Sequence, residues 1–257
     1  MMLALDTSTS FASIALVRDR TLIAELSWDV GRGHSVELLP RLRWLLETYG
    51  RAWREVSAVG VATGPGSFNG LRVAVTTAKM LALSLGVPVF GVPTLDVIAW
   101  GAADAAGPVW ATMDAGRGQL YAAAYAAPAE SARAWRPLDA YMIMTPTELS
   151  TRIAVGSIVC GEWLAETELA LRAAVGARAR IRSPLAGRRA AWLAELALAR
   201  AAEPDAADEP AALEPLYLRR PGITSSARMA RPVLKNEPVA EISAAPGGEE
   251  APRALRR

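Results

Sequence analysis

Two short turns, each led by an aspartate, are the parts of this sequence best suited to bind a phosphate or a metal ion. The first, Asp6–Ser10, offers one carboxylate, four hydroxyl groups and several backbone amides between two apolar runs. Such a turn could hold phosphate oxygens directly and a magnesium ion through water. The alternative is an ordinary turn, in which Asp6, Thr7 and Ser8 bond to their own backbone. The second turn, Asp114–Gly118, with Gly116 at its centre, raises the same question.

A glycine-rich loop, Gly64–Gly70, leads directly into a predicted helix. Its amides and the helix N-terminus could bind an anion, or its glycines could simply make a tight strand-to-helix connection. It is not a Walker A loop, because the G-x-x-x-x-G-K-[ST] spacing is absent and Arg72 cannot be assumed to replace the phosphate-binding lysine. Neither reading explains Phe68, a bulky aromatic at the tip of the loop, which indicates a contact surface.

The sequence is poor in residues for catalysis or metal binding. His34 is the one histidine and Cys160 the one cysteine, which excludes an intrachain disulfide, a thiolate metal cluster and a multi-histidine metal site. No Ser-His-Asp or Cys-His pair is persuasive. We therefore predict no catalytic residue, no tightly bound metal or cofactor, and a Cys160 that serves as a small buried hydrophobe.

The charge pattern argues against an independent role in binding nucleic acid. Basic and acidic residues balance up to Arg220, so the net charge of +2 comes from the residues that begin at Pro221. A protein that binds a polyanion by itself usually has an excess of positive charge, which residues 1–220 lack. Any role on RNA should be indirect or shared.

The first hundred residues carry the clearest pattern of secondary structure. Three β-rich runs joined by short polar turns are followed by apolar residues at helical spacing, in which Ser35 is the candidate N-cap and Gly50 the stop. Strands and helices then alternate, and Thr94 is the candidate cap of a short helix. The expected strands are 3–5, 11–17, 21–28, 56–62 and 87–92, and the expected helices are 35–49, 71–85 and one from Leu95. This βββαβαβα unit predicts a mixed sheet whose later strands are parallel.

The second half repeats this opening weakly. An expected strand at 109–113, the turn led by Asp114 and a strand at 120–127 match the first two strands and their turn. Beyond them we expect a helix near 147–153, a strand at 157–160 and an alanine-rich helix at 188–202. We predict an α/β fold with an N-terminal lobe at 1–104, a smaller lobe at 105–221 and a disordered tail at 222–257. With no apolar run of membrane-spanning length and no signal peptide pattern, we expect a cytoplasmic protein.

Six segments, taken in order, resemble the bacterial TsaB proteins, also called the YeaZ family and related to the glycoproteases. The resemblance covers residues 1 to about 220, and its most specific part is the block 64–72, in which Asn69 replaces the usual threonine. The segments are Leu3–Thr9, His34 with 38–40, Gly64–Arg72, Gly91–Leu95, Met113–Gly118 and Glu214–Arg219.

The resemblance implies an actin-like (ribonuclease H-like), two-lobed fold and a non-catalytic subunit. Its partner would be TsaD, which carries the metal and, with the ATPase TsaE, moves a threonylcarbamoyl group onto the adenosine beside the tRNA anticodon. The resemblance also implies that the two early helices form the partner surface, which could support a homodimer when the partner is absent. ATP or ADP would bind only at the interface with the partner. The expected partner-binding residues are His34, Leu38, Leu39, Leu42, Gly64, Pro65, Gly66, Ser67, Phe68, Leu71, Arg72 and Val75.

Two other functions compete with this hypothesis. An independent actin-like phosphotransferase would use Asp6 and Asp114 around magnesium-ATP, but the second half shows no clear glycine-rich loop for adenosine. A peptidase is the least supported, because a nucleophile–base pair and metal ligands are missing. If the partner-subunit hypothesis holds, the two aspartate-led turns are vestigial nucleotide loops.

Overall fold

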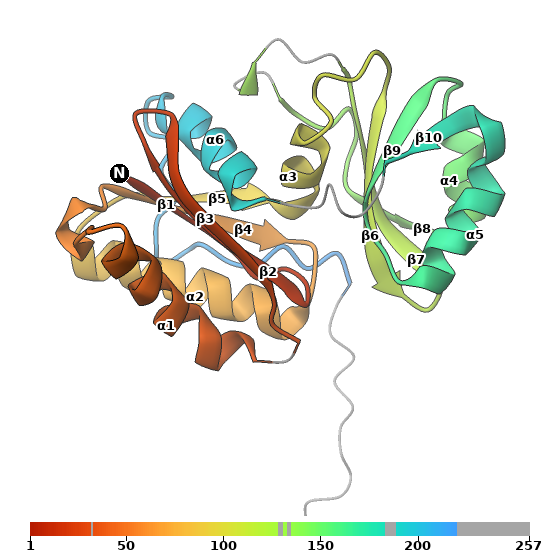
Figure 1. Ribbon diagram of the computed structural model, residues 1–257. Helices are drawn as coiled ribbons and strands as arrows, with labels where there is room; N and C mark the ends of the chain where they lie inside the picture. The colour runs from red at the N-terminus through yellow and green to blue at the C-terminus, as the bar shows by residue number, and fades with distance from the viewer. Residues whose placement is uncertain (32, 128–130, 133–134, 183–188, 220–257) are drawn as a thin grey trace, which may run out of the picture. The chain divides into compact units, whose positions relative to one another are not determined.

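The first sheet has five strands, of which three form an antiparallel meander (Figure 1). These three are β1 (Met2–Asp6), β2 (Phe11–Arg18) and β3 (Thr21–Asp29). The strands β4 (Ala58–Gly64) and β5 (Val89–Pro93) extend the sheet in parallel on the other side of β1. The resulting order is β3-β2-β1-β4-β5.

The second sheet repeats this arrangement. The strands β6 (Val109–Gly116), β7 (Gln119–Tyr125) and β8 (Met142–Met144) form the meander. The strands β9 (Ser157–Glu162) and β10 (Ala179–Ile181) run parallel to β6, in the order β10-β9-β6-β7-β8. Because β6 corresponds to β1 and β7 to β2, the weak internal repeat in the sequence marks a genuine structural repeat. The α/β class with mixed sheets and the actin-like (ribonuclease H-like) topology are confirmed.

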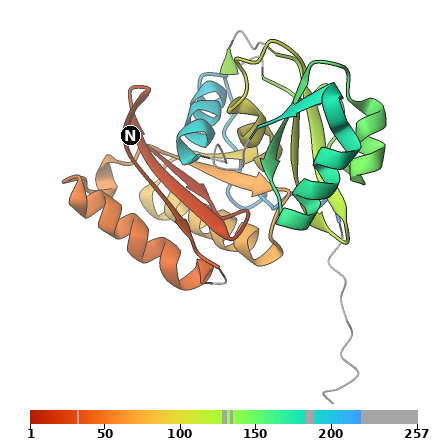
Figure 2. The ribbon, with the colours of Figure 1, turned by 45° about the vertical axis from the view of Figure 1, so that its right-hand side comes forward.

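Each sheet carries two helices on one face. On the first sheet these are α1 (His34–Thr48) and α2 (Phe68–Leu85), and on the second they are α4 (Pro146–Arg152) and α5 (Ala165–Val175). The remaining helices, α3 (Thr94–Trp100) and α6 (Ala190–Ala201), lie on the other faces, between the two sheets (Figure 2). Short 3₁₀ segments occur at Trp53–Glu55 and Gly176–Arg178.

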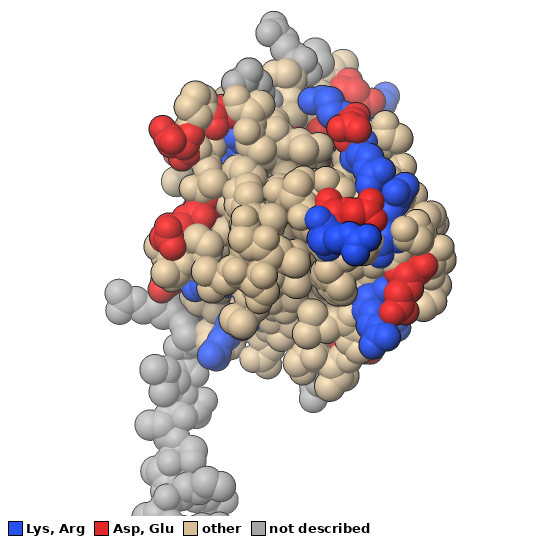
Figure 3. Space-filling view, turned by 90° about the vertical axis from the view of Figure 1, so that its left-hand side faces the viewer, with Lys and Arg blue, Asp and Glu red and all other residues tan. Residues whose placement is uncertain are grey.

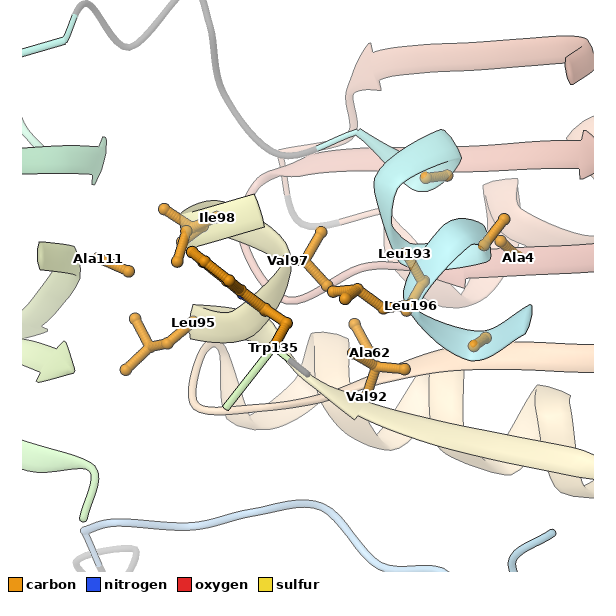
Figure 4. Close-up of a cluster of buried hydrophobic side chains, with 14 of the residues drawn as sticks. Ala4, Ala62, Val92, Leu95, Val97, Ile98, Ala111, Trp135, Leu193 and Leu196 are labelled. Atoms are coloured by element: carbon orange, nitrogen blue, oxygen red, sulfur yellow. The ribbon is translucent and has the colours of Figure 1, made fainter. Parts of the chain in front are cut away.

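The two halves exchange their last helices. Helix α3, from the first half, packs on β6 and β9 as well as on its own sheet, and α6, from the second half, packs on β1, β2, β4 and β5. A continuous apolar core results (Figure 4), to which α3 contributes Leu95 and Ile98, α6 contributes Leu193 and Leu196, and β6 contributes Ala111. Although the chain position of α6 put it in the expected second lobe, 105–221, it completes the core of the first sheet.

The structure, a computed structural model, describes residues 1–31, 33–127, 131–132, 135–182 and 189–219, all in one compact unit. The expected tail at 222–257 lies outside these residues. None of the helices in the described ranges is long and apolar enough to cross a membrane.

Three expected helix starts are wrong. Helix α1 begins at His34 with Gly33 at its N-cap, so Ser35 is not the cap. Helix α2 begins at Phe68 because Ser67 caps it, so Phe68 belongs to the first turn of the helix and not to a loop tip. Thr94 is the first residue of α3 and does not cap it; its hydroxyl bonds elsewhere.

Candidate functional site

A chain of hydrogen bonds runs from Asp6 in the β1–β2 turn through Ser8 and Thr94 to Gly64. Oδ1 of the fully buried Asp6 accepts from the amide of Ser8 at 2.9 Å and from its hydroxyl at 2.6 Å. Since the Ser8 hydroxyl has one hydrogen and donates it to Asp6, the Thr94 hydroxyl, 2.9 Å away, donates to Ser8. Thr94 in turn accepts from the amide of Gly64 at 3.1 Å. Thr7 donates to the carbonyl of Gly70 at 2.7 Å and so ties the turn to α2, whereas the bond from the Ser8 amide to Asp6 lies within the turn, as in the ordinary-turn alternative.

The second aspartate-led turn is also tied to a helix, but by a side chain. Oδ2 of Asp114 accepts from the amide of Leu164 at 2.6 Å, and Oδ1 accepts from the hydroxyl of Thr167 at 2.9 Å. Leu164 is the N-cap residue of α5 and has no capping side chain of its own. Asp114, which lies in β6, therefore caps the N-terminus of α5. Gly116 lies beyond this contact with a φ of 71° and ends β6, so Asp114 belongs to the strand and not, as had been expected, to the turn.

The loop before α2 packs directly on the β1–β2 turn. The amide of Ser67 donates to the carbonyl of Ser8 at 2.6 Å. A Cβ added to Gly66 would overlap the carbonyl oxygen of Ser8, and one added to Gly70 would overlap that of Thr7. The glycines are therefore needed for a close backbone approach, as in the tight strand-to-helix connection.

His34 fixes the start of α1 to the same turn. Its Nε2 lies 2.7 Å from the carbonyl oxygen of Thr9, and its side chain is buried. Because a carbonyl only accepts, Nε2 carries the hydrogen of this bond. His34 thus acts on the interior of the turn, and its side chain contributes little to the exposed surface.

The expected partner-binding residues divide into a buried and an exposed set. Leu38, Leu42 and Val75 are buried in the core between the sheet and its helices, and Leu71 is fully buried, so these four side chains are not, as had been expected, exposed on a surface. Gly64 and Pro65 are also buried. Leu39, at 50% exposure, Phe68, at 39%, and the exposed Arg72 remain available to a partner.

The exposed faces of α1 and α2 carry further apolar side chains that the sequence analysis missed. They are Val36 and Trp44 on α1 and Met80 and Leu83 on α2, all more than half exposed. We call these four residues, with Leu39 and Phe68, the docking face. Figure 3 shows the side of the molecule that lies to the left in Figure 1, where charged groups lie on both sides of an uncharged area.

A groove of about 470 Å³ borders the docking face at Phe68. The ring of Tyr217 lies 5.2 Å from that of Phe68, and the guanidinium of Arg72 lies over the Phe68 ring at 5.3 Å. Lys79 forms part of the wall and donates to the carbonyls of Ala211 and Leu213, both at 3.1 Å. The contact between Tyr217 and Phe68 could not be predicted from any short-range pattern in the sequence.

Comparisons with known proteins assign this chain to a family. The chain is 33% identical over 164 residues to the tRNA threonylcarbamoyladenosine biosynthesis protein TsaB of Escherichia coli, covering 63% of this chain and 68% of that protein. The chain belongs to the TsaB family. It is 40% identical to TsaB of Bacillus subtilis over 123 residues, which span 48% of this chain and 54% of that protein. The matched stretch thus spans about half the length of that relative.

Solved structures and a family model agree with this membership. YeaZ from Pseudomonas aeruginosa superimposes with a TM-score of 0.68 at 28% identity, covering 84% of this chain and 99% of that chain. A second structure, titled as similar to the peptidase YeaZ from the same organism, gives a TM-score of 0.70 at 27% identity, covering 85% of this chain and 99% of that one. The family model of TsaD, tRNA N6-adenosine threonylcarbamoyltransferase, matches residues 29–137.

Metal-binding chemistry is sparse in this TsaB-family chain. Among the residues that the structure describes, no group of three or more His, Cys, Asp or Glu side chains could hold a metal ion. Burial raises the pKa of the Cys160 thiol to about 12, so the thiolate is disfavoured. The expectation that Cys160 is a buried hydrophobe is confirmed.

Proposed function

We propose that this chain acts in tRNA threonylcarbamoyladenosine biosynthesis as a non-catalytic subunit that binds TsaD through its docking face. The names of its relatives support the pathway, and the match to the TsaD model fits a pair of related subunits. TsaE would act in the same assembly, and tRNA would be contacted through the complex and not by this chain alone.

The observation that carries this proposal is the apolar exposure of α1 and α2. Trp44 is 54% exposed, Met80 57% and Leu83 63%. Aromatic residues and methionine are enriched in protein interfaces, and large apolar patches are uncommon on monomers. The ion pairs Arg41–Glu37 and Arg43–Glu47 place charged groups on α1 beside these side chains. A second copy of the chain could occupy the same face when TsaD is absent.

The state of the polar turns supports a non-catalytic role. Asp6 accepts from Ser8, and Asp114 caps α5, so each carboxylate already has structural partners. His34 donates its Nε2 hydrogen to a carbonyl and is not placed as a base beside a nucleophile. ATP or ADP would then bind at the interface with the partner, where TsaD supplies the remaining groups.

The test is tRNA threonylcarbamoylation in a mixture of the partner enzymes with and without this chain. We expect modification to require the chain. Leu39→Glu and Met80→Glu should weaken TsaD binding by about 30-fold or more, because each buries a charge in an apolar interface. Leu169→Glu is the matched control, since Leu169 is 71% exposed on α5 of the second half.

Folding of each variant is checked by circular dichroism, and affinity by calorimetry. Equal binding of TsaD by all three variants would exclude the docking face. Modification that proceeds equally without the chain, together with ATP turnover that is lost in Asp6→Ala, would favour the independent phosphotransferase.

A further inference from the structure

The segment 208–219, which we call the strap, joins the first sheet to the second. It begins at the edge of the first sheet, where the Asp208 carboxylate accepts from the amide of Gly91 at 2.6 Å and forms an ion pair with Arg200 at 3.1 Å. In Figure 1 it is the light-blue segment that runs past α2 toward the second sheet.

The middle of the strap is held against α2 and the end of β4. Leu213 is buried in the core beneath α2, and the amide of Leu216 donates to the carbonyl of Thr63 at 2.7 Å. The next residue, Tyr217, places its ring against Phe68 of the docking face. Tyr217 and Phe68 are 38% and 39% exposed, so a partner on the docking face can cover both rings.

The end of the strap holds the second sheet. The guanidinium of Arg219 donates to the carbonyl of Ala115 at 2.8 Å and to the side-chain oxygen of Gln119. These two residues flank the turn of the β6–β7 hairpin. Because Arg219 follows Tyr217 by two residues, at most about 7 Å of extended backbone separates the docking face from this clamp.

We propose that the strap couples the docking face to the second half: a partner packed on Phe68 and Tyr217 tightens the hold of Arg219 on the β6–β7 hairpin. Immobilising the Tyr217 ring restricts the backbone that carries Arg219, so the clamp loses less entropy when it closes. This inference rests on the proposed docking of TsaD. It adds that docking is transmitted to the half of the chain that bears no docking face.

The first test uses the free protein and follows hydrogen–deuterium exchange of the hairpin amides, residues 114–121. Tyr217→Ala should raise their exchange rate about threefold or more, because the strap loses its anchor on Phe68. Tyr217→Phe keeps the ring and should exchange as the wild type does. Tyr49→Ala removes an exposed ring at the far end of α1 and should have no effect. Equal hairpin rates in Tyr217→Ala and the wild type would overturn the coupling.

The second test adds TsaD. Binding should slow hairpin exchange in the wild type, whereas Arg219→Ala should bind TsaD with an affinity within about threefold and show no such slowing. Equal slowing in Arg219→Ala would overturn the role of the clamp. If wild-type protein does not bind TsaD, the proposed function fails, and the first test still decides whether the strap links Phe68 to the hairpin.

Discussion

The two halves of this chain share one topology but differ in what they expose. Both place two helices on one face of a five-stranded sheet. In the first half these helices have 15 and 18 residues and carry the docking face, whereas in the second they have 7 and 11 residues. Within α4 and α5, Leu169 is the large apolar residue that is exposed. The two halves therefore share a topology but not an apolar surface. That surface depends on the length of the helices and on the residues that do not face the core.

The halves also differ in how the first strand pair is joined to its second helix. In the first half, backbone packs on backbone, because Gly66 and Gly70 let α2 approach the β1–β2 turn. In the second half, the Asp114 side chain spans the distance and caps α5. Where two main chains are in contact, an added side chain has no space and the backbone must move. Where a side chain makes the contact, its removal costs only the hydrogen bonds that it made. Breaking the two junctions should therefore have unequal effects.

The largest effect is expected for Gly70→Ala. In an exposed helix this change stabilises by up to about 1 kcal/mol, but here the new Cβ would overlap the carbonyl oxygen of Thr7. We expect a net loss of about 2–3 kcal/mol in the free energy of unfolding. Urea denaturation measures it.

Thr76→Ala is the matched control, because Thr76 is exposed on the same helix. Its free energy of unfolding should stay within about 0.5 kcal/mol of the wild type. A Gly70→Ala protein more stable than the wild type would show that helix propensity outweighs the close approach, and that the two junctions do not differ in the way described.

The first half was predictable in detail because its elements are long and strongly patterned. Apolar runs and helical spacing identified all five strands and both long helices within a few residues. In the second half, β8 and β10 were not expected, because they have three residues each, too few to show a period. Helix α5 was not expected either, because its cap comes from Asp114 and not from a residue next to the helix.

The candidate site was predictable by helix but not by side chain. The repeating leucines predicted the helix α1, but adjacent positions such as Leu38 and Leu39 lie on opposite sides of the boundary between core and solvent. That boundary depends on how the helix is rotated on its sheet, which one helix's sequence leaves undetermined. The Phe68–Tyr217 contact depends on the path of the strap and is equally invisible to local pattern.

A smaller effect is expected at the second junction. Asp114→Ala removes the cap of α5 and should lower the free energy of unfolding by about 1 kcal/mol, measured by urea denaturation. Asp139→Ala serves as the control, because Asp139 is exposed in the loop before β8. A loss as large as that of Gly70→Ala would make the two junctions equivalent and remove the contrast between them.

The exchanged helices α3 and α6 extend the comparison into the interior. Helix α6 meets the first sheet through apolar residues, with Arg189 paired to Glu25 at its start. Helix α3 instead buries a carboxyl group: Oδ1 of Asp96 accepts from the hydroxyl groups of Tyr125 and Tyr141, both at 2.7 Å. Burial raises the pKa of Asp96, and the two tyrosine hydrogen bonds offset part of that rise. The pKa values of both tyrosines are raised as well, chiefly by burial, so they remain hydrogen donors.

The smallest expected effect is a pH dependence that Asp96→Asn should remove. Because the pKa of Asp96 in the folded state lies above its ordinary value of 3.8, the folded state holds this proton more tightly than the unfolded state does. The contribution of Asp96 to stability is therefore fully present below that ordinary value and is lost as pH rises through the folded-state pKa. An asparagine can still accept both tyrosine hydrogens through its amide oxygen but does not ionise. Urea denaturation over a pH series should show the stability of Asp96→Asn rising relative to the wild type across this window and then levelling off. A pH-independent difference would mean that the ionisation of Asp96 does not affect how firmly α3 is held, and would remove this contrast between the two exchanged helices.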